Sequence, residues 1–343
     1  MTYDSVKRVL AIVPNWLGDV AMATPALRAL HRRFPQAELS VSGPPAACAL
    51  LDGLPWISHF LPVPPRARVV DLFHAATRLR PKARDIAVVF PHSFRAALLA
   101  RLSGARRRVG HARDGRRFLL TDRVEPHRED GRIAPVYMAT EYLDIVKALG
   151  CEDDHRGLEL AASARAIAEV REHLVGPGSL VGIAPGAAFG PSKRWAPERY
   201  AEVADRLREA SGAQCVLLTG PGEEDTRRAV QKAARQPLVE CDEGRPTIDS
   251  LKAAISQLDL LIGNDSGPRH VAIAFHVPTI CIMGPTRPVY SAGPYERGTV
   301  IRVDVDCGPC QRPVCTEDHR CMTRITPDRV VESALAYLPA ARV

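Results

Sequence analysis

The sequence has no long apolar run and few aromatic residues, and these shortages exclude several classes of protein. No stretch reaches the ~18 consecutive apolar residues that a membrane-spanning helix needs. The apolar stretch that follows Lys7 and Arg8 ends at Pro14, which indicates a buried strand rather than a signal peptide. We therefore expect a cytosolic chain whose contact with a membrane is at most peripheral.

Two glycine-rich nucleotide-binding patterns are also missing. No G-x-G-x-x-G follows the first apolar strand, which argues against a Rossmann oxidoreductase. The glycine-containing segment 185–195 lacks the G-K-[ST] ending of a P-loop. Any phosphate binding in this chain must therefore use a loop other than a P-loop or a dinucleotide-binding motif.

The composition indicates a globular protein of two domains with an uneven charge. The 343 residues are 46% hydrophobic and 25% charged, and their net charge is +7. Residues 66–132 alone hold 17 Lys and Arg against 7 Asp and Glu. This excess is either an ordinary basic surface or a face for an anionic partner. With 5% aromatic residues and no nucleic-acid motif, nucleic acid is not expected, whereas a phosphorylated or carboxylated glycolipid suits the charge.

Short β-rich runs alternate with amphipathic helical stretches along both halves of the chain, which predicts two doubly wound α/β domains. The segment Gly176-Pro-Gly178 is the predicted hinge, which gives domains at 1–175 and 176–325. A final helix within 326–343 could pack back on the N-terminal domain. Thr24 is the predicted N-cap of an early helix. Because such sheets bind ligands at the carboxyl ends of their strands, the loops that follow strands are the candidates for chemistry.

Two of these loops carry one conspicuous charged residue each. Asp19 ends the segment 14–19 after the first strand and could act as a general base, or it could cap a local turn. Lys193 lies in segment 185–195, where glycine amides and a cation could hold a phosphate. The alternative for Lys193 is an exposed basic loop.

Two further loops carry acidic residues at the start of a predicted helix. Glu223, or its neighbour Glu224, could accept both hydroxyls of a ribose, or could simply interact with the helix dipole. Asp265 follows a buried strand and precedes a helix that Ser266 or Gly267 could cap. The open start of that helix could seat a pyrophosphate, with His270 one turn further on. A purely structural cap is the alternative.

Four of the nine cysteines, Cys307, Cys310, Cys315 and Cys321, fall within one short segment. Four thiolates at such spacing suit a structural zinc ion, although the pattern is not that of a common zinc finger. Reduced thiols, which a reducing compartment favours, and a disulfide are the alternatives. Under none of these three interpretations do we expect a catalytic metal ion.

Taken together, the motifs resemble glycosyltransferase family 9, the heptosyltransferases of lipopolysaccharide assembly. The resemblance covers nearly the whole chain, and it is carried by Asn15-Trp-Leu-Gly-Asp-Val20, Pro91-His-Ser-Phe-Arg95, Gly110–Asp122, Pro185–Trp195, Asn264-Asp-Ser-Gly267 with His270, and the cysteine segment. It implies a GT-B fold, in which two Rossmann-like domains face a central cleft. Pro268-Arg269 departs from the family, which usually has an apolar or small pair before the histidine.

The resemblance also implies the chemistry and the roles of individual residues. The expected reaction is an inverting transfer of heptose from ADP-heptose to the inner core of lipopolysaccharide, with no metal or other cofactor. Asp19 would deprotonate the acceptor, and Lys193 would neutralise the diphosphate. Donor binding would further involve Glu223, Asp265, Ser266, Gly267 and His270. The anionic glycolipid acceptor, at the inner-membrane face, would meet Ser93, Arg95, Arg113 and Arg116.

Two other functions stay open from the sequence alone. A GT-B nucleotide-sugar epimerase would share the fold and a diphosphate site but would need no acceptor. A basic anion- or nucleic-acid-binding protein without catalysis would explain the charge alone.

Overall fold

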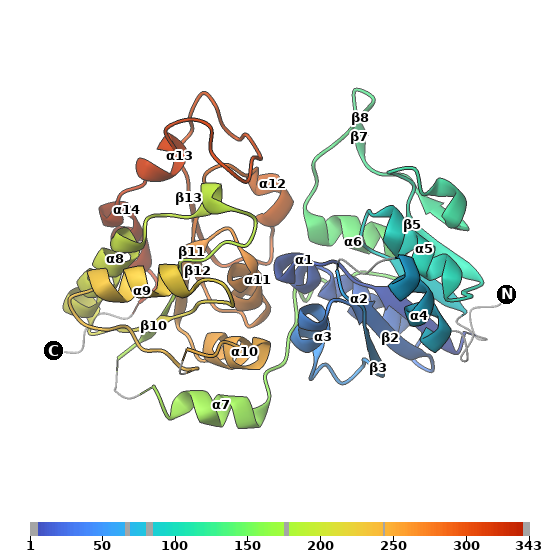
Figure 1. The fold of residues 1–343 in the computed structure, drawn as a ribbon, viewed down its shortest axis with the longest axis horizontal. Helices are drawn as coiled ribbons and strands as arrows, with labels where there is room; N and C mark the ends of the chain where they lie inside the picture. The colour runs from blue at the N-terminus through green and yellow to red at the C-terminus, as the bar shows by residue number, and fades with distance from the viewer. Residues whose placement is uncertain (1–5, 66–68, 80–84, 175–177, 243, 339–343) are drawn as a thin grey trace. The chain divides into compact units, whose positions relative to one another are not determined.

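The computed structural model describes residues 6–65, 69–79, 85–174, 178–242 and 244–338, which form two compact units, Met1–Ala161 and Ala162–Val343. Each unit is a parallel sheet with helices on both faces (Figure 1). Within these described ranges, no helix is both long and apolar enough to cross a membrane.

The first unit contains a six-stranded parallel sheet with the order β3-β2-β1-β4-β5-β6. Its strands are β1 (Arg8–Ile12), β2 (Glu38–Gly43), β3 (His59–Pro62), β4 (Ile86–Val89), β5 (Arg107–His111) and β6 (Asp122–Val124). A small antiparallel hairpin follows, made of β7 (Arg128–Glu129) and β8 (Arg132–Ile133). The strand order reverses between β1 and β4, which is where open α/β sheets bind ligands.

Helices cover both faces of this sheet because its strands are apolar on both sides. Leu10, Ile12, Ala87 and Val89 pack with α5 on one face, while α2 packs with α6. The helices are α1 (Leu17–Met22), α2 (Thr24–Arg33), α3 (Pro45–Leu51), α4 (Val69–Leu79), α5 (Phe94–Leu102) and α6 (Met138–Lys147), with a short 3₁₀ turn at Arg117–Leu119.

The segment after β1 differs from the predicted loop. A short helix, α1, begins at Leu17 and places Asp19 in its first turn. Thr24 is therefore not an N-cap: Ala23 occupies that position, and the Thr24 hydroxyl donates to the carbonyl of Ala21 at 2.7 Å. The two helices follow one another with only Ala23 between them, a turn that the early Pro25 permits because its missing N–H would be unpaired there.

The second unit contains a five-stranded parallel sheet with the order β10-β9-β11-β12-β13. Its strands are β9 (Leu180–Ala184), β10 (Gln214–Leu217), β11 (Leu260–Asn264), β12 (Thr279–Ile282) and β13 (Gly298–Ile301). Here the order reverses between β9 and β11. The loops that follow these two strands are therefore the expected ligand-binding loops of this unit.

Two groups of helices cover the second sheet. The side chains of α8 and α14 share one core with Ile183 of β9, Ile262 of β11 and Ile282 of β12, whereas α10 packs with α7 and α11. The helices are α7 (Ala164–Arg171), α8 (Pro197–Ser211), α9 (Glu224–Ala233), α10 (Ile248–Ser256), α11 (Gly267–Ala274), α12 (Pro288–Ser291), α13 (Arg320–Thr323) and α14 (Pro327–Leu335), with a 3₁₀ turn at Pro191–Lys193.

The units divide after Ala161, upstream of the hinge that we predicted at 176–178. Of that hinge, 176 and 177 lie outside the described residues. Helix α7 belongs to the second unit because it packs on α10, and Arg171 Nε donates to Gln257 Oε1 at 2.8 Å. The C-terminal helix α14 packs on α8 of the second unit, where Val330 and Ala334 complete the core.

Candidate active site

In the first unit, the carboxyl ends of β1, β4 and β5 lie side by side, since Ile12 pairs with Val89 and Val89 with Gly110. Asp19, in the first turn of the helix α1 that follows β1, is half-buried at this edge. Its charge contributes, after burial, to the raised pKa of Tyr142 on α6. Asp19 therefore lies at the point where this sheet is expected to bind a ligand.

Glu141 on α6 connects the loops that follow β4 and β5. Its Oε1 lies 2.9 Å from His92 Nε2 and 3.5 Å from Arg113 Nη1, and its backbone carbonyl accepts from His111 Nε2 at 3.1 Å. Burial alone would raise the pKa of Glu141, but the hydrogen bond and charge of His92 lower it. The sequence analysis missed Glu141; the available signal was an acid within the apolar stripe of a helix.

The four predicted acceptor residues have different surroundings. Ser93 is the N-cap of α5, because its hydroxyl accepts from the N–H of Ala96 at 3.3 Å, and Arg95 is exposed on the first turn. Arg113 is half-buried beside Asp114 and Glu141. Of the three arginines, Arg95 is therefore the one whose side chain is exposed to an anionic ligand.

Arg116 does not have the surface position that an acceptor contact requires. Its side chain is fully buried, and its guanidinium donates to the backbone carbonyls of Pro91, Ser93 and His111. Burial lowers its pKa to about 10. Arg116 therefore joins the loop after β4 to the end of β5 and supports the site from within the fold.

In the second unit, Asn264 at the end of β11 holds the loop that follows β9. Its Nδ2 donates to the carbonyls of Pro185 and Gly186 at 2.7 and 3.3 Å. Its Oδ1 accepts from the Trp195 N–H at 3.2 Å and from the Tyr200 hydroxyl at 2.9 Å. Because all four groups of this buried amide are satisfied, the 185–195 loop is fixed against the Asp265 turn.

Asp265 is a buried carboxylate with three charged or polar partners. Its Oδ2 accepts from Lys193 Nζ at 2.8 Å and from the Thr286 hydroxyl at 2.7 Å, while its Oδ1 accepts from Arg269 Nη1 at 2.9 Å. Arg269 also pairs with both oxygens of Glu296, at 2.7 and 2.5 Å. Although burial opposes ionisation, Lys193 and Arg269 hold the pKa of Asp265 well below its usual range.

Lys193 brings a cation to the start of α11. Its Nζ donates to the side chain and to the carbonyl of Asp265, which leaves the third N–H of the ammonium for another acceptor. Ser266 is the N-cap of α11, yet its buried Oγ has no hydrogen-bond partner within the described part of the chain. The amides at Gly267 and beyond therefore begin a helix that no side chain caps.

His270, one turn into α11, is almost fully buried, and its Nδ1 likewise has no partner among the described residues. Burial, with the charge of Arg269, lowers the pKa of His270 to about 4. The imidazole is therefore neutral near pH 7. It can offer a hydrogen bond but not a charge.

Glu223 approaches the loop after β9 from the start of α9. Its Oε2 accepts from the Gly220 N–H at 2.8 Å, and a Cβ built on Gly186 would lie 2.0 Å from its Oε1. The neighbouring Glu224 is exposed and accepts from the Gly222 N–H instead. The structure thus brings Glu223, rather than Glu224, to the loop that carries Lys193.

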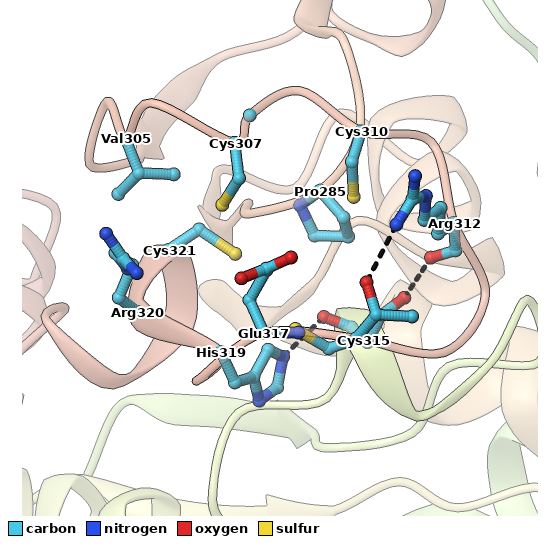
Figure 2. Close-up of a pocket in the computed structure, with 13 residues that line it drawn as sticks. Pro285, Val305, Cys307, Cys310, Arg312, Cys315, Glu317, His319, Arg320 and Cys321 are labelled. Carbon is cyan, nitrogen blue, oxygen red and sulfur yellow. Dashed lines mark hydrogen bonds between the residues drawn. The ribbon is translucent and has the colours of Figure 1, made fainter.

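The four clustered cysteines line a separate cavity beside the turn that carries Lys193 (Figure 2). All nine cysteines of the chain are free thiols in the structure.

Two doubly wound parallel α/β units, each with its candidate ligand-binding loops at the strand ends, are the architecture of the GT-B fold class. Solved structures agree. The family 9 glycosyltransferase from Veillonella parvula superposes with a TM-score of 0.86 at 24% identity and covers 98% of both chains. The ADP-heptose LPS heptosyltransferase II of Escherichia coli superposes with a TM-score of 0.80 at 26% identity, over 96% of this chain and 98% of that one.

The family model of glycosyltransferase family 9 (heptosyltransferase) matches residues 72–320. The chain belongs to this family. A curated relative, lipopolysaccharide heptosyltransferase 2 of Escherichia coli K12, is 28% identical over 96% of this chain and 98% of its own length. Membership of the family decides in favour of a transferase over the epimerase and the non-catalytic binding protein.

Proposed function

We propose that the protein transfers heptose from ADP-heptose to a heptose of the lipopolysaccharide inner core, with inversion at the anomeric carbon and without a metal ion. Both relatives from Escherichia coli are named as heptosyltransferases of lipopolysaccharide, and the solved one is named for ADP-heptose. The acceptor is then an anionic glycolipid at the cytoplasmic face of the inner membrane, which suits the basic residues of the first unit.

Asp19 is the general base of this proposal. It takes the proton of the acceptor hydroxyl while that oxygen forms a bond to the anomeric carbon and the bond from this carbon to the phosphate oxygen breaks. ADP leaves with the electron pair of the broken bond. A half-buried carboxylate at the ligand-binding edge of a sheet has the right chemistry for this role.

The donor residues of the second unit receive the diphosphate. Lys193 offers its remaining N–H, and the uncapped start of α11 offers the Gly267 amide and the Ser266 hydroxyl. These groups offset the negative charge that develops on the leaving ADP, as a metal ion does in other transferases. Glu223 accepts from the ribose hydroxyls. His270 acts as a neutral hydrogen-bonding group.

Asp265 can offer only part of its carboxylate to the donor sugar, because Lys193, Arg269 and Thr286 already donate to it. Its three internal partners use part of the roughly four acceptor positions of a carboxylate, and sugar hydroxyls would take what remains. The observation that carries the proposal is the 2.8 Å pair between Lys193 and Asp265 at the start of α11, because it sets a cation beside an open helix N-terminus.

The experiment is a transfer assay with purified protein, ADP-heptose and an inner-core acceptor that carries one heptose. The expected result is one mole of ADP released per mole of heptose transferred, with the opposite anomeric configuration to the donor, and an unchanged rate in EDTA. Donor consumption without acceptor would favour the epimerase. Transfer only from another nucleotide sugar would contradict the proposed donor.

A further inference from the structure

His92 lies in the loop that follows β4, beside the point where the strand order of the first sheet reverses. β4 ends at Val89, and Asp19 follows the neighbouring strand β1 on the other side of that point. Open α/β sheets bind their ligands between the loops that flank such a reversal. His92 and Asp19 therefore border the same ligand-binding edge.

The backbone of His92 is held on both sides by one buried side chain. The guanidinium of Arg116 donates to the carbonyl of Pro91 and, at 3.4 Å, to the carbonyl of Ser93. Ser93 is also the N-cap of α5, so the residue after His92 belongs to the start of a helix. A functional side chain is presented most exactly from a backbone that is fixed in this way.

The side chain of His92 is held by Glu141 of α6. His92 Nε2 is buried and lies 2.9 Å from Glu141 Oε1. Although burial opposes ionisation, His92, His111 and Arg113 lower the pKa of Glu141. An ionised carboxylate has lone pairs and no hydrogen to give, so the hydrogen between these two atoms belongs to His92 Nε2.

The charge of Glu141 has a permanent partner other than His92. Arg113 Nη1 lies 3.5 Å from the same carboxylate oxygen. On the other side, the ring of His111 meets the ring of His92 edge-on, with centroids 5.9 Å apart, and burial lowers the pKa of His111. His92 is thus placed between a carboxylate and a neutral ring, where it acts as a hydrogen donor to Glu141.

The second ring nitrogen of His92 is left for a ligand. The side chain is 25% exposed although Nε2 is buried, so the open edge of the ring is the one that carries Nδ1. In a neutral imidazole whose hydrogen is on Nε2, Nδ1 has a lone pair and accepts hydrogen bonds. His92 therefore suits a ligand group that donates, such as a hydroxyl.

We propose that His92 binds the acceptor sugar, with Nδ1 accepting a hydrogen bond from a second hydroxyl while Asp19 takes the proton of the reacting one. Glu141 is the positioning residue, because it fixes the tautomer and the orientation of the ring. A site built to hydrogen-bond a hydroxyl discriminates against analogues that lack it, so this pair selects the acceptor. The proposal rests on the proposed function, which makes a sugar hydroxyl the nucleophile.

The first test compares two substitutions of His92. Asn is the shorter amide, and its side-chain oxygen can take the place of Nδ1, whereas Gln reaches toward Glu141 and leaves the place of Nδ1 empty. His92→Gln should weaken binding of an inner-core acceptor with one heptose by about tenfold or more, and His92→Asn by about threefold or less. ADP binding should be unchanged in both variants.

His127→Gln is the matched control for these variants. His127 Nε2 lies 2.6 Å from Asp144 Oδ2, so His127 also pairs with a carboxylate of α6. It follows β6, the edge strand of the sheet, and not a strand at the reversal of strand order. Acceptor binding should therefore stay near that of the wild type.

The second test removes hydroxyls from the acceptor instead of changing the protein. In a set of acceptors that each lack one heptose hydroxyl, the wild type should bind one analogue about tenfold more weakly than the full acceptor. That analogue should still carry the reacting hydroxyl. His92→Gln should bind it and the full acceptor equally, because the contact is already lost.

The third test reads the tautomer directly. In nitrogen NMR spectra of protein with isotope-labelled histidine, the signals that disappear in His92→Gln belong to His92. The hydrogen should be on Nε2 in the wild type and in Glu141→Gln, whose amide oxygen still accepts it. Glu141→Ala should lose this preference and weaken acceptor binding, without adding to the loss in His92→Gln. If Glu141→Ala folds poorly, Glu141→Gln still reports the tautomer.

Several results would overturn the proposal. These are equal acceptor binding by His92→Gln and the wild type, equal weakening of ADP and acceptor binding, and a His92 hydrogen on Nδ1 or on both nitrogens at the pH of the transfer assay. A wild type that binds all the deoxy analogues alike would also overturn it. The expected pattern of acceptor binding in a protein that transfers no heptose from ADP-heptose would instead contradict the proposed function and leave the His92 contact standing.

Discussion

Gly186 lies so close to Glu223 that a Cβ at position 186 would be 2.0 Å from Glu223 Oε1. Gly186→Ala should therefore push the Glu223 side chain away from the loop after β9. If Glu223 binds the ribose, ADP affinity should fall by about tenfold, equivalent to 1.4 kcal/mol. The measurement is calorimetric titration with ADP.

Gly220→Ala is the matched control for this prediction. A Cβ there would lie 3.7 Å from the same carboxylate, an ordinary contact, and the Gly220 N–H that binds Glu223 would be kept. ADP affinity should stay near that of the wild type. Equal affinities of the two variants would show that Glu223 does not contact the nucleotide.

Asp19→Asn tests the general base. Transfer should fall by ~100-fold or more, the scale for a lost base, because an amide cannot take the acceptor proton. ADP affinity should be unchanged, since Asp19 and the donor residues belong to different units. Asp130→Asn, in the exposed β7–β8 turn where φ is 49°, is a control that Asn tolerates. Activity above a tenth of the wild type in Asp19→Asn would exclude this assignment.

Alanine substitutions of Arg116 and Arg95 should distinguish a structural role from a ligand-binding role. Arg116→Ala removes a fully buried guanidinium that donates three hydrogen bonds to backbone carbonyls, and it should destabilise the first unit by about 3 kcal/mol. Arg95→Ala removes an exposed side chain, so stability should change by less than about 0.5 kcal/mol while the KM for the anionic acceptor rises. Thermal melting and acceptor titration provide both readouts. An Arg116→Ala variant that melts like the wild type would restore Arg116 as a ligand contact.

Much of the fold, and the meeting of two candidate donor residues, could be predicted because both follow from local patterns. Continuous apolar runs such as Leu260–Asn264 form buried parallel strands, and the loop after each strand reaches the ligand-binding edge. Lys193 and Asp265 were predicted separately, and the 2.8 Å contact between them follows from the adjacent ends of β9 and β11.

The remaining features depend on contacts between distant segments. Arg116 looks like any surface arginine in a basic stretch, and only the carbonyls of Pro91 and His111 reveal that it is buried. Glu141 is one acid in a helix until His92 and Arg113 meet it. Helix α1 was missed because six residues are too few for a clear helical period.

Arg269 departs from the family pattern and has a structural explanation. Its guanidinium joins the carboxylate of Asp265 to that of Glu296 within the core of the second unit. Its neighbour His270 is buried beside the positive charge of Arg269, and both burial and this charge lower the pKa of His270.

The buried imidazole of His270 should make the second unit less stable in mild acid. Burial, with a smaller effect of Arg269, lowers the pKa of His270 to about 4, while Asp265 and Glu296 act in the opposite direction. The unfolded value is ~6.5. Between these two pH values the unfolded chain binds a proton that the folded chain does not. Stability should therefore rise as pH increases from 4 to 6.5 and should stop changing, as far as this group is concerned, above 6.5.

The expected contribution is on the order of 2–3 kcal/mol across that window. The test compares melting temperatures of wild type, His270→Asn and His270→Gln from pH 4 to pH 7. Because the variants carry no titrating group at 270, their melting temperatures should rise less steeply with pH, whatever their absolute stability. His276→Asn, at an exposed position with a φ of 60° that Asn tolerates, should follow the wild-type slope. Parallel curves for the wild type and both position-270 variants would mean that His270 is protonated or solvated in the folded protein, and its role as a neutral hydrogen-bonding group beside the diphosphate would then be wrong.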